Sequence, residues 1–335
     1  MLILRRVLAT LPILFGAAVF TFMLTRVLPG DAASFLASGQ ASAEEISALR
    51  AQLGLDQPLH LQLLGYLGQL ARGDWGQSFT TGQPVVTDLL QRLPASLELS
   101  LIAFALALAI GVPLGVAAAL RPGHWIDHLC RAVCTAGSCA PTFVVGLLLI
   151  YAFYFLLGWA AEPIGRLDAM LAPPPVHTGF LLIDAAWAGD APAWRSAFGH
   201  LLLPGVSMAL FSIAPLARIT RSSMLGVLSS DFMRTARALG LPRRQTVVAY
   251  ALRNALLPVL TTLGMVFSYM LGANVVIEKL FAWPGIGSYA LDALMSADHA
   301  PVQGFVLLVA VLFSLVNLLV DLLGQWADPR SAGAQ

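Results

Sequence analysis

Six apolar runs of about 20 residues or more constrain this chain more than any other feature of its sequence. They cover residues 7–28, 96–120, 133–159, 201–220, 255–276 and 302–323. A helix needs about 20 mostly apolar residues to cross the hydrocarbon core of a bilayer. Only 11% of the 335 residues are charged and 58% are hydrophobic, whereas an average soluble domain carries about 25% charged residues. The sequence therefore predicts an all-α membrane protein with six transmembrane helices.

The basic residues predict the orientation of these spans, because Arg and Lys near span ends are retained on the cytoplasmic side. With the N-terminus inside, 12 of the 19 basic residues lie in cytoplasmic segments, and 14 of the 18 acidic residues lie outside. We therefore predict a multi-pass protein of the cell (inner) membrane with both termini in the cytoplasm. A cleaved signal peptide is the alternative for the first run, but that run is about twice as long as a signal h-region and lacks a small-x-small cleavage site at the proper distance.

The loops divide the chain into three expected parts. Residues 1–28 form the cytoplasmic N-terminus and the first span, residues 29–95 an extracytoplasmic cap, and residues 96–335 a five-helix core. The cap contains two amphipathic patterns, at residues 43–53 and 59–70, that predict short helices. Two further external stretches are expected, the Pro-rich segment 160–200 and the segment 278–301, which could dip back into the membrane.

The segment at residues 223–258, between the fourth and fifth spans, is expected to be cytoplasmic and predicts two short helices with a break between them. Ser230 or Asp231 can cap the first helix. Gly240 can end it, because glycine reaches the left-handed conformation that closes helices without strain. Pro242 suits the opening of the second helix.

This segment resembles the coupling motif of permease subunits in ATP-binding-cassette importers, in the dipeptide, oligopeptide and nickel branch. Other stretches resemble the same branch in the same order: LPGDAAS (28–34), LGLDQPLHLQ (53–62), RGDWGQSFTTGQPV (72–85), RLPASLEL (92–99), VVIEKLFAWPGIG (275–287) and VDLLGQWADPR (320–330). The resemblance implies a coupling site that docks on a cytoplasmic ATPase. The resemblance places Arg234, Thr235, Ala236 and Gly240 in this motif. With the neighbouring residues whose types suit docking, the full expected site is Arg234, Thr235, Ala236, Ala238, Leu239, Gly240, Leu241, Arg243 and Arg244.

The residue types of this segment also fit docking without the resemblance. The small residues Ala236, Ala238 and Gly240 let a helix approach a partner closely, and Leu239 and Leu241 can fill an apolar notch. The alternative is an amphipathic helix that rests on anionic lipid. The segment departs from the motif of other branches at Arg234, where those branches carry an acidic residue, and its distance from Gly240 to Pro258 exceeds that of sugar permeases.

The chain lacks the sequence of a phosphate-binding loop, which needs Gly-Lys followed by Ser or Thr. Its only lysine is Lys279, which follows Glu278. We therefore expect no bound cofactor and no ATP hydrolysis by this chain, with ATP and Mg²⁺ used by partner ATPases. An intramembrane hydrolase and a proton-coupled secondary transporter are the alternatives from other classes, but the sequence has no hydrolase motif and almost no acidic residue in mid-span.

The resemblance implies four kinds of partner: a second homologous permease, two ATPase subunits, an extracytoplasmic solute-binding protein and the lipid bilayer. No nucleic-acid partner is expected. The expected solutes are di- or oligopeptides, with nickel chelates and glutathione-like compounds as alternatives.

Three further groups of polar residues have local interpretations. Ser268 and Asn274 could line the solute pathway at the outer end of the fifth span. Asp321 is expected to form a structural ion pair with Arg218 or Arg221, because an unpaired charge at membrane depth is costly. His124 and His128 lie four residues apart, as metal ligands on one helical face would, but a basic turn between two spans explains them equally well and no metal site is predicted.

Overall fold

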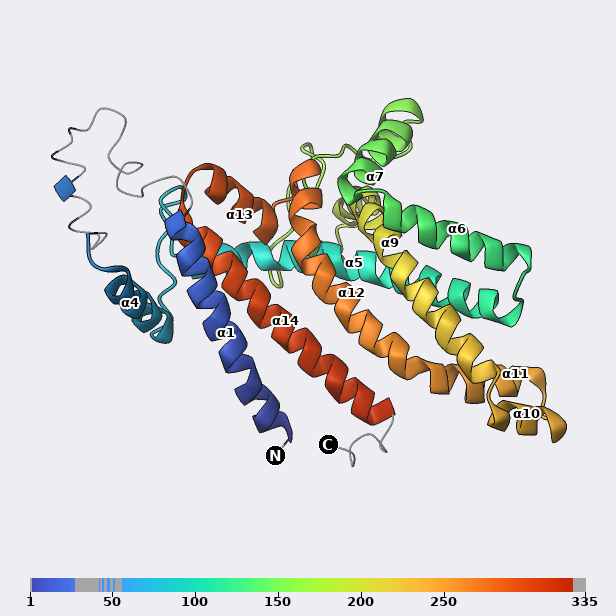
Figure 1. The fold of residues 1–335 in the computed structure, drawn as a ribbon. Helices are drawn as coiled ribbons and strands as arrows, with labels where there is room; N and C mark the ends of the chain where they lie inside the picture. The colour runs from blue at the N-terminus through green and yellow to red at the C-terminus, as the bar shows by residue number, and fades with distance from the viewer. Residues whose placement is uncertain are drawn as a thin grey trace. The chain divides into compact units, whose positions relative to one another are not determined.

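The computed structural model describes residues 2–27 and 56–327, together with the isolated positions 42, 44, 47, 48 and 51. Regular structure in these residues is helical, and the only bridge between extended segments pairs Gln77 with Pro84. The helices are α1 (Leu2–Val27), α4 (Leu59–Ala71), α5 (Val85–Leu120), α6 (Trp125–Cys139), α7 (Thr142–Leu149), η1 (Ile150–Leu156), α8 (Leu181–Trp187), α9 (Ala191–Leu228), α10 (Asp231–Ala238), α11 (Arg243–Gln245), η2 (Thr246–Leu252), α12 (Arg253–Leu280), α13 (Ile286–Met295) and α14 (His299–Ala327). Figure 1 shows them in chain order by colour. The all-α prediction is confirmed.

Four helical stretches in the described part of the chain are long and apolar enough to cross a membrane. They cover residues 85–120, 191–228, 246–272 and 299–324, and together they account for four of the six expected spans. The first expected span lies in α1, whose apolar stretch over residues 10–26 is shorter. These helices indicate a multi-pass membrane protein, and the number of six spans stays a prediction.

The third expected span is broken in the middle. The span predicted over residues 133–159 is not a continuous helix, because α6 ends at Cys139 and α7 begins at Thr142, with a bend of 105° between them. Ala140 has an extended backbone with φ −89° and ψ 127°. Steric conflict with a following proline disfavours the helical conformation, so Pro141 accounts for the break. If the bent pair counts as one span, the described residues contain five.

The two helices expected within residues 29–95 have different outcomes. The helix expected over residues 59–70 is α4. The one expected over residues 43–53 lies outside the described residues except at isolated positions.

The chain divides into two compact units, one of residues 1–95 and 284–314 and the other of residues 96–283 and 315–335. In the first unit, Val85 and Leu89 of α5 pack with Ile286 and Tyr289 of α13. Tyr289 Oη donates a hydrogen bond to Asp88 Oδ2 at 2.8 Å inside this core. Burial raises the pKa of Tyr289, and the bond to Asp88 raises it further, so the phenol stays a proton donor.

Helix α9 is the centre of the second unit, where it contacts α6, α7, α8 and α12 (Figure 1). Small residues allow these contacts to be close. A Cβ atom added to Gly115 of α5 would lie 2.7 Å from the carbonyl oxygen of Ala217, and one added to Gly137 of α6 would lie 3.0 Å from that of Leu210. The buried core at the α6 contact contains Ala118, Cys130, Cys134, Ala214 and Ala217.

Candidate functional site: the loop between α9 and α12

Helix α10 follows α9 closely and ends at Gly240, as the sequence predicts. Gly240 has a φ of +73°, in the left-handed region that favours glycine. Its N–H donates to the Arg237 carbonyl at 3.0 Å, and the N–H of Leu241 donates to the Ala236 carbonyl at 3.3 Å. This pair of bonds is the Schellman arrangement, which satisfies carbonyl groups at a helix end.

The start of α10 differs from the prediction. Ser230 occupies the N-cap position, but its side chain makes no capping bond. Its hydroxyl donates instead to the carbonyl oxygen of Val227, in the last turn of α9. The backbone N–H of Ser230 donates to the same carbonyl at 3.1 Å.

The two faces of α10 have different environments. Met233 and Ala236 are buried, and Met233 belongs to a core that also holds Met224 of α9 and Ala251 of η2. The other residues of α10 are exposed, namely Asp231, Phe232, Arg234, Thr235, Arg237 and Ala238. The side chain of Leu239, which directly follows the helix, is 74% exposed. Of the expected coupling residues in this part of the loop, Arg234, Thr235, Ala238 and Leu239 are therefore exposed, whereas Ala236 is buried.

The second helix of the loop is longer than expected. The chain remains helical from Arg243 through η2, a π-helical stretch, into α12. The prediction of a second short helix is therefore wrong, since Pro242 opens the helix but residues 243–257 contain neither Gly nor Pro to end it. Pro258 lies inside α12. Arg244 is exposed at the start of this helix, and Leu241 is half-buried.

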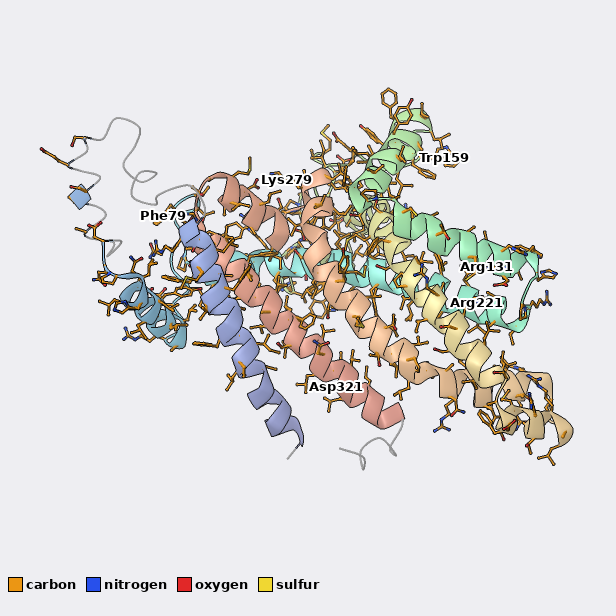
Figure 2. The ribbon with its side chains drawn as sticks, in the orientation of Figure 1. Phe79, Arg131, Trp159, Arg221, Lys279 and Asp321 are labelled. Carbon is orange, nitrogen blue, oxygen red and sulfur yellow. The ribbon has the colours of Figure 1, made fainter. Side chains whose placement is uncertain are left out.

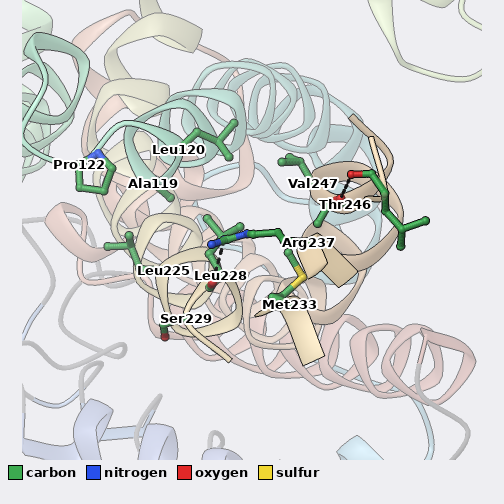
Figure 3. Close-up of a pocket in the computed structure, with 11 residues that line it drawn as sticks. Ala119, Leu120, Pro122, Leu225, Leu228, Ser229, Met233, Arg237, Thr246 and Val247 are labelled. Atoms are coloured by element: carbon green, nitrogen blue, oxygen red, sulfur yellow. Dashed lines mark hydrogen bonds between the residues drawn. The ribbon is translucent and has the colours of Figure 1, made fainter. Parts of the chain in front are cut away.

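A cavity of about 690 Å³ lies behind α10 (Figure 3). Its walls come from the end of α5, the end of α9, α10 and η2. Most of the lining residues are apolar, and Arg237 is the only charged one. No local sequence pattern predicts this cavity, because it forms only where four segments meet.

Ser268 and Asn274, the two residues suggested for the pathway, are both buried within the chain. Asn274 Nδ2 lies 3.4 Å from the Ser96 carbonyl oxygen and 3.3 Å from Ser100 Oγ on α5. Ser268 is 7% exposed. These contacts describe helix packing, and a role of either residue in the pathway stays a prediction.

Arg221 of α9 pairs with Asp127 of α6, 94 residues earlier in the chain. Its Nε lies 2.6 Å from Asp127 Oδ1 in a buried contact between α9 and α6. Arg131 lies 3.3 Å from the other oxygen of the same carboxylate, and Figure 2 shows both arginines. Arg218 approaches the Cys134 carbonyl. Arg221 thus pairs with Asp127, and an ion pair of Asp321 with Arg218 or Arg221 stays a prediction.

A second buried ion pair organises the Pro-rich segment that precedes α8. Arg166 Nη2 lies 2.6 Å from Glu98 Oε2, and the guanidinium carbon lies 5.7 Å from the centre of the Trp283 ring. Glu98 also accepts hydrogen bonds from the backbone N–H groups of Leu181 and Leu182. The one signal in the sequence was an acidic residue near the start of an otherwise apolar span, which usually marks a specific partner.

Asp184 holds the same segment from the other side. Its carboxylate accepts hydrogen bonds from the N–H and hydroxyl groups of Thr178 and from the N–H of Gly179. Burial raises the pKa of Asp184, but these hydrogen bonds outweigh burial and hold the pKa below its ordinary value. Asp184 is therefore charged at neutral pH and keeps residues 178–179 folded onto α8.

Comparison with known proteins agrees with this architecture. Residues 111–333 match the family described as "Binding-protein-dependent transport system inner membrane component", and residues 1–100 match its N-terminal region. A probable D,D-dipeptide transport system permease of Escherichia coli is 43% identical over 94% of this chain and 92% of its own. A di/tripeptide transport system permease of Pseudomonas aeruginosa is 42% identical over 97% of both chains.

A solved structure shares the fold at lower sequence identity. It is an inward-facing conformation of the MetNI methionine ABC transporter, with a TM-score of 0.50 and 16% identity, and the match covers 71% of this chain and 95% of that one. The likeness shows the fold alone. From the family models and the relatives, this chain belongs to the binding-protein-dependent transport system inner membrane components, in the branch that contains dipeptide transport permeases.

Proposed function

We propose that this chain is one of two membrane-spanning permease subunits in an ATP-driven importer of dipeptides or oligopeptides. Relatives at 43% and 42% identity are named as permeases for D,D-dipeptides and for di- and tripeptides. In this proposal the second permease completes the pathway, two ATPases supply energy from the cytoplasm, and an extracytoplasmic binding protein delivers the solute. Both termini of the chain lie in the cytoplasm.

The observation that carries the proposal is the exposed face of α10. Phe232 on α10 is 45% exposed and Leu239, the residue that directly follows this helix, is 74% exposed, although both are large and apolar. Their exposure fits a short helix that inserts into an apolar groove of a partner. Arg234 and Arg244 flank this face and are placed to meet acidic residues on the rim of the groove.

The structure of the loop suits the transmission of force from the ATPases. Helix α10 packs on η2, and η2 continues without a break into α12. A displacement of α10 would therefore act on a helix long enough to cross the membrane. Nucleotide shifts the balance between inward-open and outward-open states only by binding them unequally, and paired movement of the two coupling loops is the proposed route.

The solute class follows from the relatives rather than from a site in this chain. We infer that the solutes are peptides. Nickel chelates or glutathione-like compounds are the alternative solutes. In this scheme the binding protein makes most of the selection, so the permease needs only a path of suitable width and polarity.

A single substitution on the exposed face tests the proposal. The chain would be co-expressed with the second permease and the ATPases of its transport system, and two quantities measured: ATPase retained on the affinity-tagged chain and ATP-dependent uptake of a radiolabelled dipeptide. Leu239→Glu should abolish both, because it places a charge in an apolar groove. Met170→Glu is the matched control, since Met170 is 92% exposed in the segment before α8. Normal ATPase retention in Leu239→Glu would refute docking through α10.

A further inference from the structure

We propose that the cavity behind α10 binds an amphipathic anion, an alkyl chain that carries one acidic head group, with the head on Arg237. The cavity volume of about 690 Å³ lies within the range of about 300 to 1,000 Å³ that is typical of small-molecule sites. Such sites are mostly apolar and contain few polar groups that fix the orientation of the ligand. This cavity has that composition (Figure 3).

The apolar part of the ligand would lie along a continuous wall. Leu225 and Leu228 come from α9, Met233 from α10, Val247 from η2, and Ala119 and Leu120 from α5. Met233 and Ala119 also belong to the buried core beneath. An alkyl chain placed here would remove apolar surface from water, which is favourable in proportion to the area buried.

The two hydroxyl groups of the lining, on Ser229 and Thr246, already donate hydrogen bonds within the protein. Ser229 Oγ donates to the Gly226 carbonyl at 2.9 Å, and Thr246 Oγ1 donates to the Pro242 carbonyl at 3.0 Å. Neither hydroxyl is therefore a free donor for a ligand. A neutral polar head group would find little to bind at these two positions.

Arg237 has the donors that the other lining residues lack. One of its N–H groups donates to the Leu228 carbonyl at 3.0 Å, and a guanidinium carries five such donors in a fixed planar fork. The remaining donors can bind a carboxylate or phosphate with two parallel bonds. Arg234, one helical turn earlier, has a different environment, because it pairs with Asp231 at 3.4 Å on the exposed face. Both arginines are exposed, but of the two only Arg237 lines the cavity.

A bound ligand would contact α5, α9, α10 and η2 together. It would therefore favour the present position of α10 over positions in which the cavity closes, as any ligand favours the state that it binds better. This consequence rests on the proposed function of α10, whereas binding itself does not.

Photolabelling in lipid nanodiscs tests the binding. The full chain, with its co-purified partners, would be placed in phosphatidylcholine discs and exposed to a diazirine-bearing dodecanoate, and labelled peptides located by mass spectrometry. We expect labels in the segments 119–122 and 225–247. Arg237→Gln should weaken labelling about tenfold, the loss expected for one charge-assisted hydrogen bond, and Arg237→Lys should restore much of it.

Further variants and probes show whether the label reports binding in the cavity through Arg237. Val247→Trp should abolish the labels by filling the cavity, while Arg234→Gln should leave them unchanged. Discs that contain phosphatidylglycerol distinguish the source of the ligand, because competition by this lipid would indicate a phospholipid and its absence a free fatty carboxylate. Equal labelling by the diazirine analogue of dodecanol, or labels unaffected by Arg237→Gln and Val247→Trp, would overturn the proposal.

Discussion

Glu98 and Arg166 form an ion pair of 2.6 Å that joins the start of the apolar run within α5 to a segment 68 residues further along the chain. The Glu98 side chain is 4% exposed, and the backbone N–H groups of Leu181 and Leu182 complete its coordination. The ion pair and these hydrogen bonds thus fix the Pro-rich segment against α5, although the segment itself has little regular secondary structure.

Removal of the Glu98 charge should release this segment. A buried partner left without its counter-charge typically costs about 3–5 kcal/mol, so Glu98→Gln should lower thermal stability and speed hydrogen exchange over residues 160–182. The double variant Glu98→Gln, Arg166→Met should recover part of the stability, since no unpaired charge then remains. Unchanged exchange in the single variant would show that the ion pair does not hold the segment.

The ion pair between Asp127 and Arg221 should contribute more to the stability of the protein than the ion pair between Asp231 and Arg234 on α10. Asp127→Asn leaves the guanidinium of Arg221 without its counter-charge in a mostly buried site, and we expect a clear fall in the melting temperature of the purified protein. Asp231→Asn is the matched control, because Asp231 and Arg234 are both well exposed and exposed pairs contribute little. Equal effects of the two substitutions would contradict this ranking.

Substitution of alanine for two glycines in long helices should have different effects on the stability of the protein. In Gly115→Ala the new Cβ would lie 2.7 Å from the Ala217 carbonyl oxygen and from Thr220 Cβ. Since backbone atoms cannot move aside easily, we expect a loss of about 1–3 kcal/mol in stability. Gly226→Ala meets nothing within 4 Å and should be neutral or stabilising by up to about 1 kcal/mol. Thermal unfolding of both variants in the same detergent decides the comparison.

Gly240 should tolerate asparagine better than leucine. No atom lies within 4 Å of a Cβ at this position, so within this chain the cost comes from the left-handed backbone, on the order of 1 kcal/mol for a residue other than glycine. Gly240→Leu should leave membrane insertion intact and impair uptake and ATPase retention, while Gly240→Asn should retain more of both. Normal uptake by Gly240→Leu with ATPases bound would remove the proposed coupling role.

Single cysteines should report the predicted topology. In a background that lacks Cys130, Cys134 and Cys139, Met170→Cys should react with an impermeant thiol reagent on intact cells. His124→Cys, in the exposed turn before α6, should react only after lysis. Labelling of both residues from the same side would contradict the predicted orientation.

Local features of the sequence were sufficient for much of the fold. Apolar runs predicted the long helices because a bilayer accepts only segments of that length and composition. Gly240 predicted the end of α10, since few other residues adopt a positive φ without strain. The break at Pro141 follows from the same kind of local rule, because proline restricts the backbone of the residue that precedes it.

Only the tertiary structure decided which polar side chains meet. Asp127 and Arg221 are 94 residues apart, and Glu98 and Arg166 are 68 apart, so no local pattern relates them. The cavity at Arg237 likewise needs the ends of α5 and α9 beside α10 and η2. The physical reason is that helix formation depends on near neighbours, whereas ion pairs and cavities depend on helix packing, which the close contacts of small residues such as Gly115 determine over the whole chain.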